Sequence, residues 1–253
     1  MTERLPSRAR PSAAAPRAGP ARRCIAEALG TGGLVAAVIG SGIMATRLTD
    51  DIALQLLVNA LATVAALGVL IAVLGPISGA HFNPVVTLVE LARRDVTVGE
   101  AGGYLVAQVA GGLAGAALAN VMFGLPVWTA ATHQRSGWGL WLGEFLATAG
   151  LLLTIGALTR TGRGHLGPVL VPAWIGAAYF FTSSTSFANP AVSIGRAFSD
   201  SFAGIAPVSL PGFITAQVLG AAAGAALTLA LFSKGIARPL DLPDAVHPCA
   251  SPH

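Results

Sequence analysis

Six apolar stretches, each about as long as a lipid bilayer is thick, constrain this chain more than any other feature of its sequence. A helix that crosses a membrane needs about 20 mostly apolar residues. Only 10% of the residues are charged, against roughly 25% in an average soluble domain. The sequence therefore predicts an all-α membrane protein. The six stretches run approximately through residues 24–46, 52–74, 102–123, 139–158, 167–182 and 211–232.

The basic residues predict how the chain is oriented. With the N-terminus inside, twelve of the 15 Lys and Arg residues fall on the inner side, and the outer side holds Arg47, Arg135 and Arg196. Inner loops of membrane proteins carry such an excess. We therefore expect a multi-pass protein of the inner (plasma) membrane with both termini cytoplasmic.

The two ends of the chain are predicted to be tails. Residues 1–23 hold six arginines and four prolines without the apolar centre of a signal peptide, which is typical of a disordered basic cytoplasmic tail. Residues 234–253 form a second cytoplasmic tail. We expect no nucleic-acid partner, because the basic residues are spread over tails and loops. No Cys/His pattern suggests a metal site, and we expect no cofactor.

The channel region between the tails, residues 24–233, contains a repeat of about 24–123 and about 138–233. Glu27, SGAHFNPVV and GYLVAQVAGGLAG follow one another in the first half, and Glu144, STSFANPAV and GFITAQVLGAAAG follow in the same order in the second. Each half holds three spans, so the second must lie inverted relative to the first, as in many transport proteins. We expect the pore between the halves.

Asn83-Pro84 and Asn189-Pro190 are predicted to begin two short helices, approximately residues 85–91 and 191–198, that are too short to cross the membrane. Asn is a favoured N-cap, and Pro is favoured at the first helical position. Inversion brings both helix starts, with their positive dipole ends, to the bilayer centre. Loops 75–82 and 182–188 should then line the pore with carbonyls, and both Asn amides can donate to a passing solute oxygen.

Glu27 and Glu144 stand at matching positions of the two repeats. A carboxylate inside a membrane is costly and is kept for a reason. The duplication, with no further carboxylate in the predicted spans, favours a structural role in which each accepts hydrogen bonds from the backbone of a re-entrant loop. A proton relay is the alternative interpretation.

With these motifs the chain resembles the aquaporin and aquaglyceroporin family (major intrinsic proteins) from about residue 24 to residue 232. The resemblance implies six transmembrane helices, two re-entrant half-helices and a homotetramer with one pore per subunit. Two positions depart from the family pattern: Val85 replaces an alanine after the first Asn-Pro, and Val192 follows Asn189-Pro190-Ala191 where the family has the arginine of the outer constriction.

The resemblance also implies the rest of that outer constriction. Ungapped offsets give Thr63, Ala177 and Ser186 beside Val192, all small residues, and so imply a wider opening than in water-selective members. Arg196 is expected near the extracellular mouth, solvated or capping, with a substitute guanidinium as the alternative. His81 is expected either to shape the cytoplasmic vestibule or to brace its loop.

We therefore expect a passive channel, not an enzyme, for small neutral solutes in the lipid bilayer. Val192 in place of arginine, together with the segment FANPAVSIGRAFSDSFAGI, resembles a bacterial subgroup of aquaglyceroporins associated with arsenic resistance. This resemblance implies passage of trivalent arsenic or antimony hydroxides, glycerol-like polyols and some water. An ordinary water or glycerol facilitator is the first alternative, and an ion-coupled secondary transporter is the second.

Overall fold

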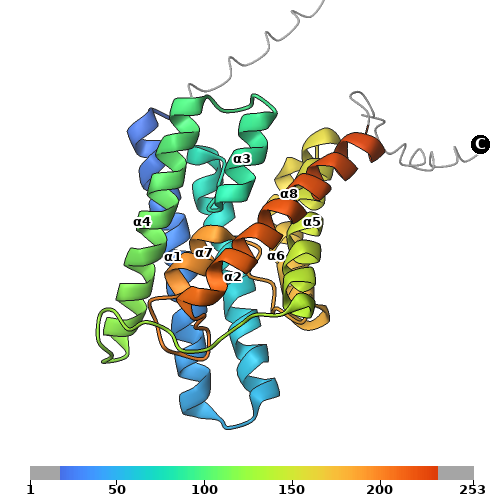
Figure 1. The fold of residues 1–253 in the computed structure, drawn as a ribbon. Helices are drawn as coiled ribbons and strands as arrows, with labels where there is room; N and C mark the ends of the chain where they lie inside the picture. The colour runs from blue at the N-terminus through green and yellow to red at the C-terminus, as the bar shows by residue number, and fades with distance from the viewer. Residues whose placement is uncertain (1–17, 233–253) are drawn as a thin grey trace, which may run out of the picture.

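The computed structural model describes residues 18–232, which fold into a bundle of helices (Figure 1). Six of these helices are long and apolar enough to cross a membrane, which confirms the predicted fold class. Two shorter helices, α3 and α7, lie among them. The helices are α1 (Pro20–Leu48), α2 (Ile52–Ser78), α3 (Pro84–Ala92), α4 (Val98–Met122), α5 (Trp138–Arg160), α6 (Gly167–Phe181), α7 (Pro190–Arg196) and α8 (Leu210–Leu231).

Each long helix begins at its predicted span or up to four residues before it, and ends within four residues of the predicted end. The first begins at Pro20, so Arg23 belongs to α1 and not to the predicted tail. Residues 1–17 and the second predicted tail, 234–253, lie outside the described residues. We call the end of the bundle where α1 begins and α8 ends the terminal end, and the opposite end, with the α1–α2 turn, the distal end (Figure 1).

The outer surface of the bundle is apolar. Leu61, Val69 and Val73 of α2 and Val106 and Leu118 of α4 are all more than half exposed. In water such a surface would drive aggregation, whereas in a bilayer lipid tails cover it. The polar side chains that are buried instead point inward, where they hold the loops between the helices.

Small residues let the helices of each repeat pack closely. A Cβ atom added at Gly115 of α4 would lie 2.1 Å from the carbonyl oxygen of Gly32 on α1, and one added at Gly224 of α8 would lie 2.2 Å from that of Ala149 on α5. Helix contact in lipid relies on such close backbone approach. The same pairing, first with third long helix, thus occurs in both repeats.

The two short helices begin inside the bundle. Asn83 caps α3 by accepting a hydrogen bond from the Val85 amide, and Asn189 caps α7 by accepting from the amides of Ala191 and Val192. Figure 1 shows α3 near the terminal end and α7 farther from it. Their starts lie together because each cap reaches the loop of the other repeat, as the site geometry shows.

Candidate functional site: a pore between two re-entrant loops

The loops before α3 and α7 share an unusual backbone. Ala80 and Phe82 have φ values of 52° and 48°, and Ser186 and Ala188, at the matching positions of the second repeat, have φ values of 52° and 48°. Residues other than glycine adopt positive φ rarely, and the surrounding structure must hold them there. Each loop is therefore fixed from outside and does not follow from local preference.

The first loop is held by Glu27. Its Oε1 accepts hydrogen bonds from the Ser78 hydroxyl (2.6 Å) and the His81 amide (3.0 Å), and its Oε2 accepts from the Phe82 amide (2.6 Å). The side-chain amide of Gln108 also donates to Oε2 (2.8 Å). A fully buried carboxylate with four donors is the arrangement that buried charge requires.

The second loop is held in the same way by Glu144. Its two oxygens accept from the amides of Phe187 (2.8 Å) and Ala188 (2.9 Å), and Gln217 donates to it at 2.6 Å. Gln217 also donates to Ser193 of α7, as Gln108 does to Thr87 of α3. The duplicated Glu and Gln of the sequence are thus two copies of one bracing unit.

The two Asn side chains connect the repeats. The Asn83 amide donates to the Ala188 carbonyl, and the Asn189 amide donates to the Phe82 carbonyl, each at 2.8 Å. A side-chain amide has two N–H donors, so one donor on each Asn remains for another partner. Both side chains line a common cavity, where that partner can be a solute oxygen.

The cavity has a volume of about 300 Å³ and lies between the two repeats. Matching residues of the repeats line it in pairs. These pairs are Ala80 and Ser186, His81 and Phe187, Phe82 and Ala188, Asn83 and Asn189, Val86 and Val192, and Glu90 and Arg196. The predicted pore-centre residues Pro84, Val85, Pro190 and Ala191 are buried beside the cavity without lining it.

Each half-helix therefore turns one face to the cavity. On α7 this face carries Asn189, Val192 and Arg196, and residues three and seven positions after the cap share one side of a helix. This face carries Val192 at the position where the resemblance implies an arginine. The arginine of this chain, Arg196, lies one helical turn farther along α7.

The predicted constriction residues lie partly where we expect them. Thr63, Ser186 and Val192 line the cavity, but Ala177 lies on an exposed face of α6. The prediction for Ala177 was wrong because the ungapped offset assumed a helical register that α6 does not have. Tyr179 lines the cavity instead, and its hydroxyl contacts the Thr63 hydroxyl at 3.2 Å.

The two residues predicted for the vestibules also lie in the cavity wall. His81 contacts Thr87 through Nδ1 at 3.0 Å, so it braces its loop and lines the cavity. Arg196 is only 2% exposed, which contradicts the expectation of a solvated arginine. The chain folds over it, and residue 203 accepts a hydrogen bond from its Nε.

Glu90 is a lining residue that the sequence reasoning missed. It lies on α3, and Arg93 approaches its carboxylate at 3.4 Å. Glu90 lies in a predicted half-helix, outside the six predicted spans to which the count of carboxylates applied. Its place seven residues after Asn83 was a signal, because Arg196 stands seven residues after Asn189.

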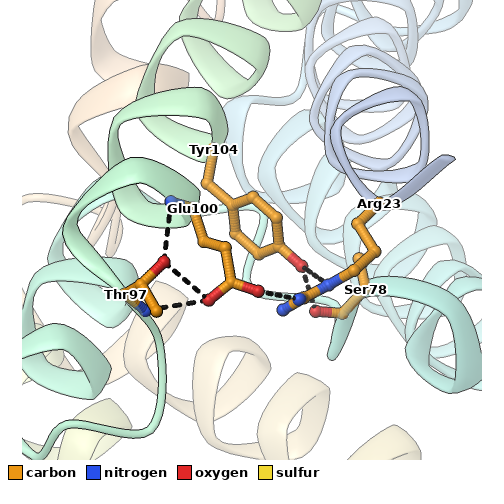
Figure 2. Close-up of polar contacts among 5 residues, drawn as sticks. All are labelled: Arg23, Ser78, Thr97, Glu100 and Tyr104. Carbon is orange, nitrogen blue, oxygen red and sulfur yellow. Dashed lines mark hydrogen bonds and ion pairs between the residues drawn. The ribbon is translucent and has the colours of Figure 1, made fainter. Parts of the chain in front are cut away.

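A second unpredicted group braces the first loop from the terminal end (Figure 2). Arg23 of α1 donates through Nε to the Tyr104 hydroxyl at 2.8 Å and pairs with Glu100 of α4. Tyr104 donates to the Ser78 carbonyl at 2.6 Å. Thr97 and Glu100 form the capping box that begins α4.

Among the described residues, no group of three or more His, Cys, Asp or Glu could hold a metal ion.

Comparison with known proteins gives three relevant similarities. A model of the major intrinsic protein family matches residues 15–188. Aquaglyceroporin AqpS of Rhizobium meliloti (strain 1021) is 53% identical over 206 residues, which cover 81% of this chain and 88% of that protein. An aquaporin of Laccaria bicolor is 32% identical over 185 residues, covering 60% of this chain and 70% of its own.

The fold is similar to a solved structure as well. The X-ray structure of the aquaglyceroporin from Plasmodium falciparum matches with a TM-score of 0.61, covering 86% of this chain and 97% of that one. The two sequences are 20% identical, so this match bears on the arrangement of helices and not on what passes between them.

Proposed function

The chain belongs to the major intrinsic protein family, and from this premise we propose that it is a passive channel for trivalent arsenic and antimony hydroxides and glycerol-like polyols, with some water. The observation that carries the proposal is Val192. It stands in the cavity wall, three residues after the capping Asn189, and supplies no charge or hydrogen-bond donor there.

The side chains that share the cavity with Val192 support a solute larger than water. Ser186 and Thr63 are small and bring hydroxyl groups, while Leu34 and Val38 add apolar wall. The Asn83 and Asn189 amides offer donors at the meeting point of the half-helices. A neutral molecule with several hydroxyls can exchange water for these groups as it passes.

Trivalent arsenic at neutral pH is a neutral trihydroxide, and it presents the same pattern as glycerol, a compact core with outward hydroxyls. Both therefore suit a cavity with alternating polar and apolar wall. Uptake into proteoliposomes separates the candidates: purified protein is compared with empty liposomes for arsenite, glycerol and water, without any ion gradient.

The outcomes of that experiment are distinct. Rapid entry of arsenite supports the metalloid assignment. Entry of glycerol or water with arsenite excluded indicates an ordinary facilitator. Uptake that requires a proton or sodium gradient indicates a secondary transporter and overturns the passive channel.

Val192→Arg is the first variant to test. A guanidinium at this position narrows the cavity between Asn189 and Arg196. We therefore expect arsenite and glycerol uptake to fall by about tenfold, while water uptake falls less. Val85→Ala, a change at a buried residue outside the cavity wall, is the control and should leave the ranking intact. Equal permeabilities before and after Val192→Arg would remove Val192 from the constriction.

We also propose that four copies assemble into a homotetramer with one pore per subunit, in the inner membrane with the terminal end in the cytoplasm. The exposed apolar faces of the bundle support a bilayer setting. Native mass spectrometry from detergent measures the assembly, and a monomeric mass with full solute uptake would contradict it.

A further inference from the structure

We propose that Arg196 is the residue that excludes cations from this pore, one helical turn farther out than Val192, and that it donates hydrogen bonds to the oxygens of arriving solutes. This inference rests on the proposed function and assigns the charge selectivity of the same cavity.

The first observation is the place of Arg196. It lies on the face of α7 that lines the cavity, seven residues after the capping Asn189, and α7 leads from the centre toward the distal end. Anything that enters from the distal end must therefore pass its guanidinium before it reaches the Asn amides. Arg196 is 2% exposed, so its charge acts where water screens it little.

The second observation is that the guanidinium is fixed. Its central carbon lies 3.4 Å from the centre of the Phe187 ring, a distance typical of a cation–π contact. Phe187 is itself held by Glu144 through its amide and packs edge-on against Phe213 at 5.1 Å. The charge thus occupies a defined position in the wall and does not follow the solute.

The third observation is that the charge is not neutralised. Among residues 18–232, no carboxylate lies within 4.0 Å of Arg196, and the described hydrogen bonds use only its Nε, which donates to the Ala203 carbonyl. Its two Nη groups are left as donors. Leaving a buried cation without a counter-charge is costly, so its retention indicates a function.

Other groups near the distal mouth do not replace this charge. Burial, helped by the guanidinium of Arg135, lowers the pKa of the His133 imidazole and favours its neutral form. Arg135 also faces the Phe187 ring, at 5.3 Å, but it donates to the carbonyls of Gly204 and Phe202 and lies outside the cavity wall. Among residues 18–232, Arg196 is thus the cation at this mouth that lines the cavity.

The wall beside it also holds an unused hydroxyl. The Ser186 Oγ is buried, lines the cavity and has no hydrogen-bond partner among the described residues. An arriving polyol can accept from the Arg196 Nη groups and pair another hydroxyl with Ser186. A metal or ammonium cation has no acceptor to offer and meets repulsion, so the same residue admits one class and rejects the other.

The test measures potassium permeability of proteoliposomes for Arg196→Gln, Arg196→Lys and the unchanged protein, with glycerol uptake as a second readout. We expect Arg196→Gln to raise potassium permeability by about tenfold or more while glycerol uptake stays within about twofold, and Arg196→Lys to keep exclusion because it keeps the charge. Arg47→Gln removes another distal guanidinium, exposed over the Phe123 ring and outside the wall, and should change neither.

A second variant guards against misfolding. Val192→Arg with Arg196→Gln moves the guanidinium one turn inward, so exclusion of potassium should return. Potassium permeability that stays at the unchanged level in Arg196→Gln, with glycerol uptake retained, overturns the proposal, as does equal leakage through the Lys and Gln variants. Failure of the proposed function looks different, because the unchanged protein then passes no polyol or arsenite at all.

Discussion

Among the single residues that shape the pore, two buried carboxylates hold its backbone in place. Glu27 and Glu144 are both fully buried, and each accepts hydrogen bonds from two consecutive loop amides, the second of which belongs to a residue with positive φ. The loops cannot relax to an ordinary turn while those bonds persist. Pore shape therefore depends on side chains that never touch the solute.

Replacing either carboxylate by its amide tests this dependence. Glu27→Gln turns an acceptor oxygen into a donor that faces loop N–H groups, and each orphaned donor costs roughly 1–3 kcal/mol. We expect faster amide hydrogen exchange at His81 and Phe82 with little change at Phe187 and Ala188. Glu144→Gln should give the reverse pattern, so each variant controls for the other. Altered proton flux with unchanged exchange in both loops would favour the proton relay instead.

The long helices of each repeat approach one another closely where glycine residues face the neighbouring helix. Gly111 and Gly115 of α4 lie against the backbone of α1, and Gly220 and Gly224 of α8 lie against that of α5. These contacts bring Gln108 and Gln217 within reach of the loop-bracing carboxylates. The geometry of the pore thus depends on the close packing of these helices.

A pair of Gly→Ala variants on α4 separates contact from helix preference. Gly115→Ala places a Cβ atom against the Gly32 carbonyl and should lower stability by about 1–3 kcal/mol. Gly102→Ala meets no atom within 4 Å and should be neutral or stabilising by up to about 1 kcal/mol. Thermal unfolding in detergent measures both. Equal shifts for the two variants would show that the α1–α4 contact tolerates a methyl group.

In the whole molecule, the two repeats are similar in backbone but place side chains of opposite charge at matching positions of the cavity wall. Glu90 lines the cavity toward the terminal end, and Arg196 occupies the matching place toward the distal end. The inverted repeat therefore does not give a symmetric pore. A solute meets a guanidinium at one mouth and a carboxylate at the other.

The orientation of this charged pore can be measured in intact cells. Cys24 and Cys249 are first replaced by Ser, and single cysteines are then placed at exposed positions, Asp50→Cys in the distal α1–α2 turn and His165→Cys between α5 and α6. With the terminal end in the cytoplasm, a membrane-impermeant maleimide should label only position 50 until the cells are permeabilised. Labelling of position 165 alone would show that the protein has the opposite orientation in the membrane.

The sequence by itself determined the class of fold and the place where the two half-helices begin. Apolar length determined the spans, because bilayer thickness sets a fixed requirement. The duplicated Asn-Pro, Glu and Gln signals determined the repeat and the start of both half-helices, because capping chemistry is local. These features can be read without knowing which helices are neighbours.

Only the tertiary structure decided which side chains face the cavity. The rotation of α6 exposes Ala177 and turns Tyr179 inward, which no ungapped offset could predict. The burial of Arg196 depends on residue 203 and on the Phe187 ring, which segments outside α7 bring to it. Local sequence sets where a helix begins, but helix rotation and chain crossing depend on packing across the whole bundle, and they set the chemistry of the pore wall.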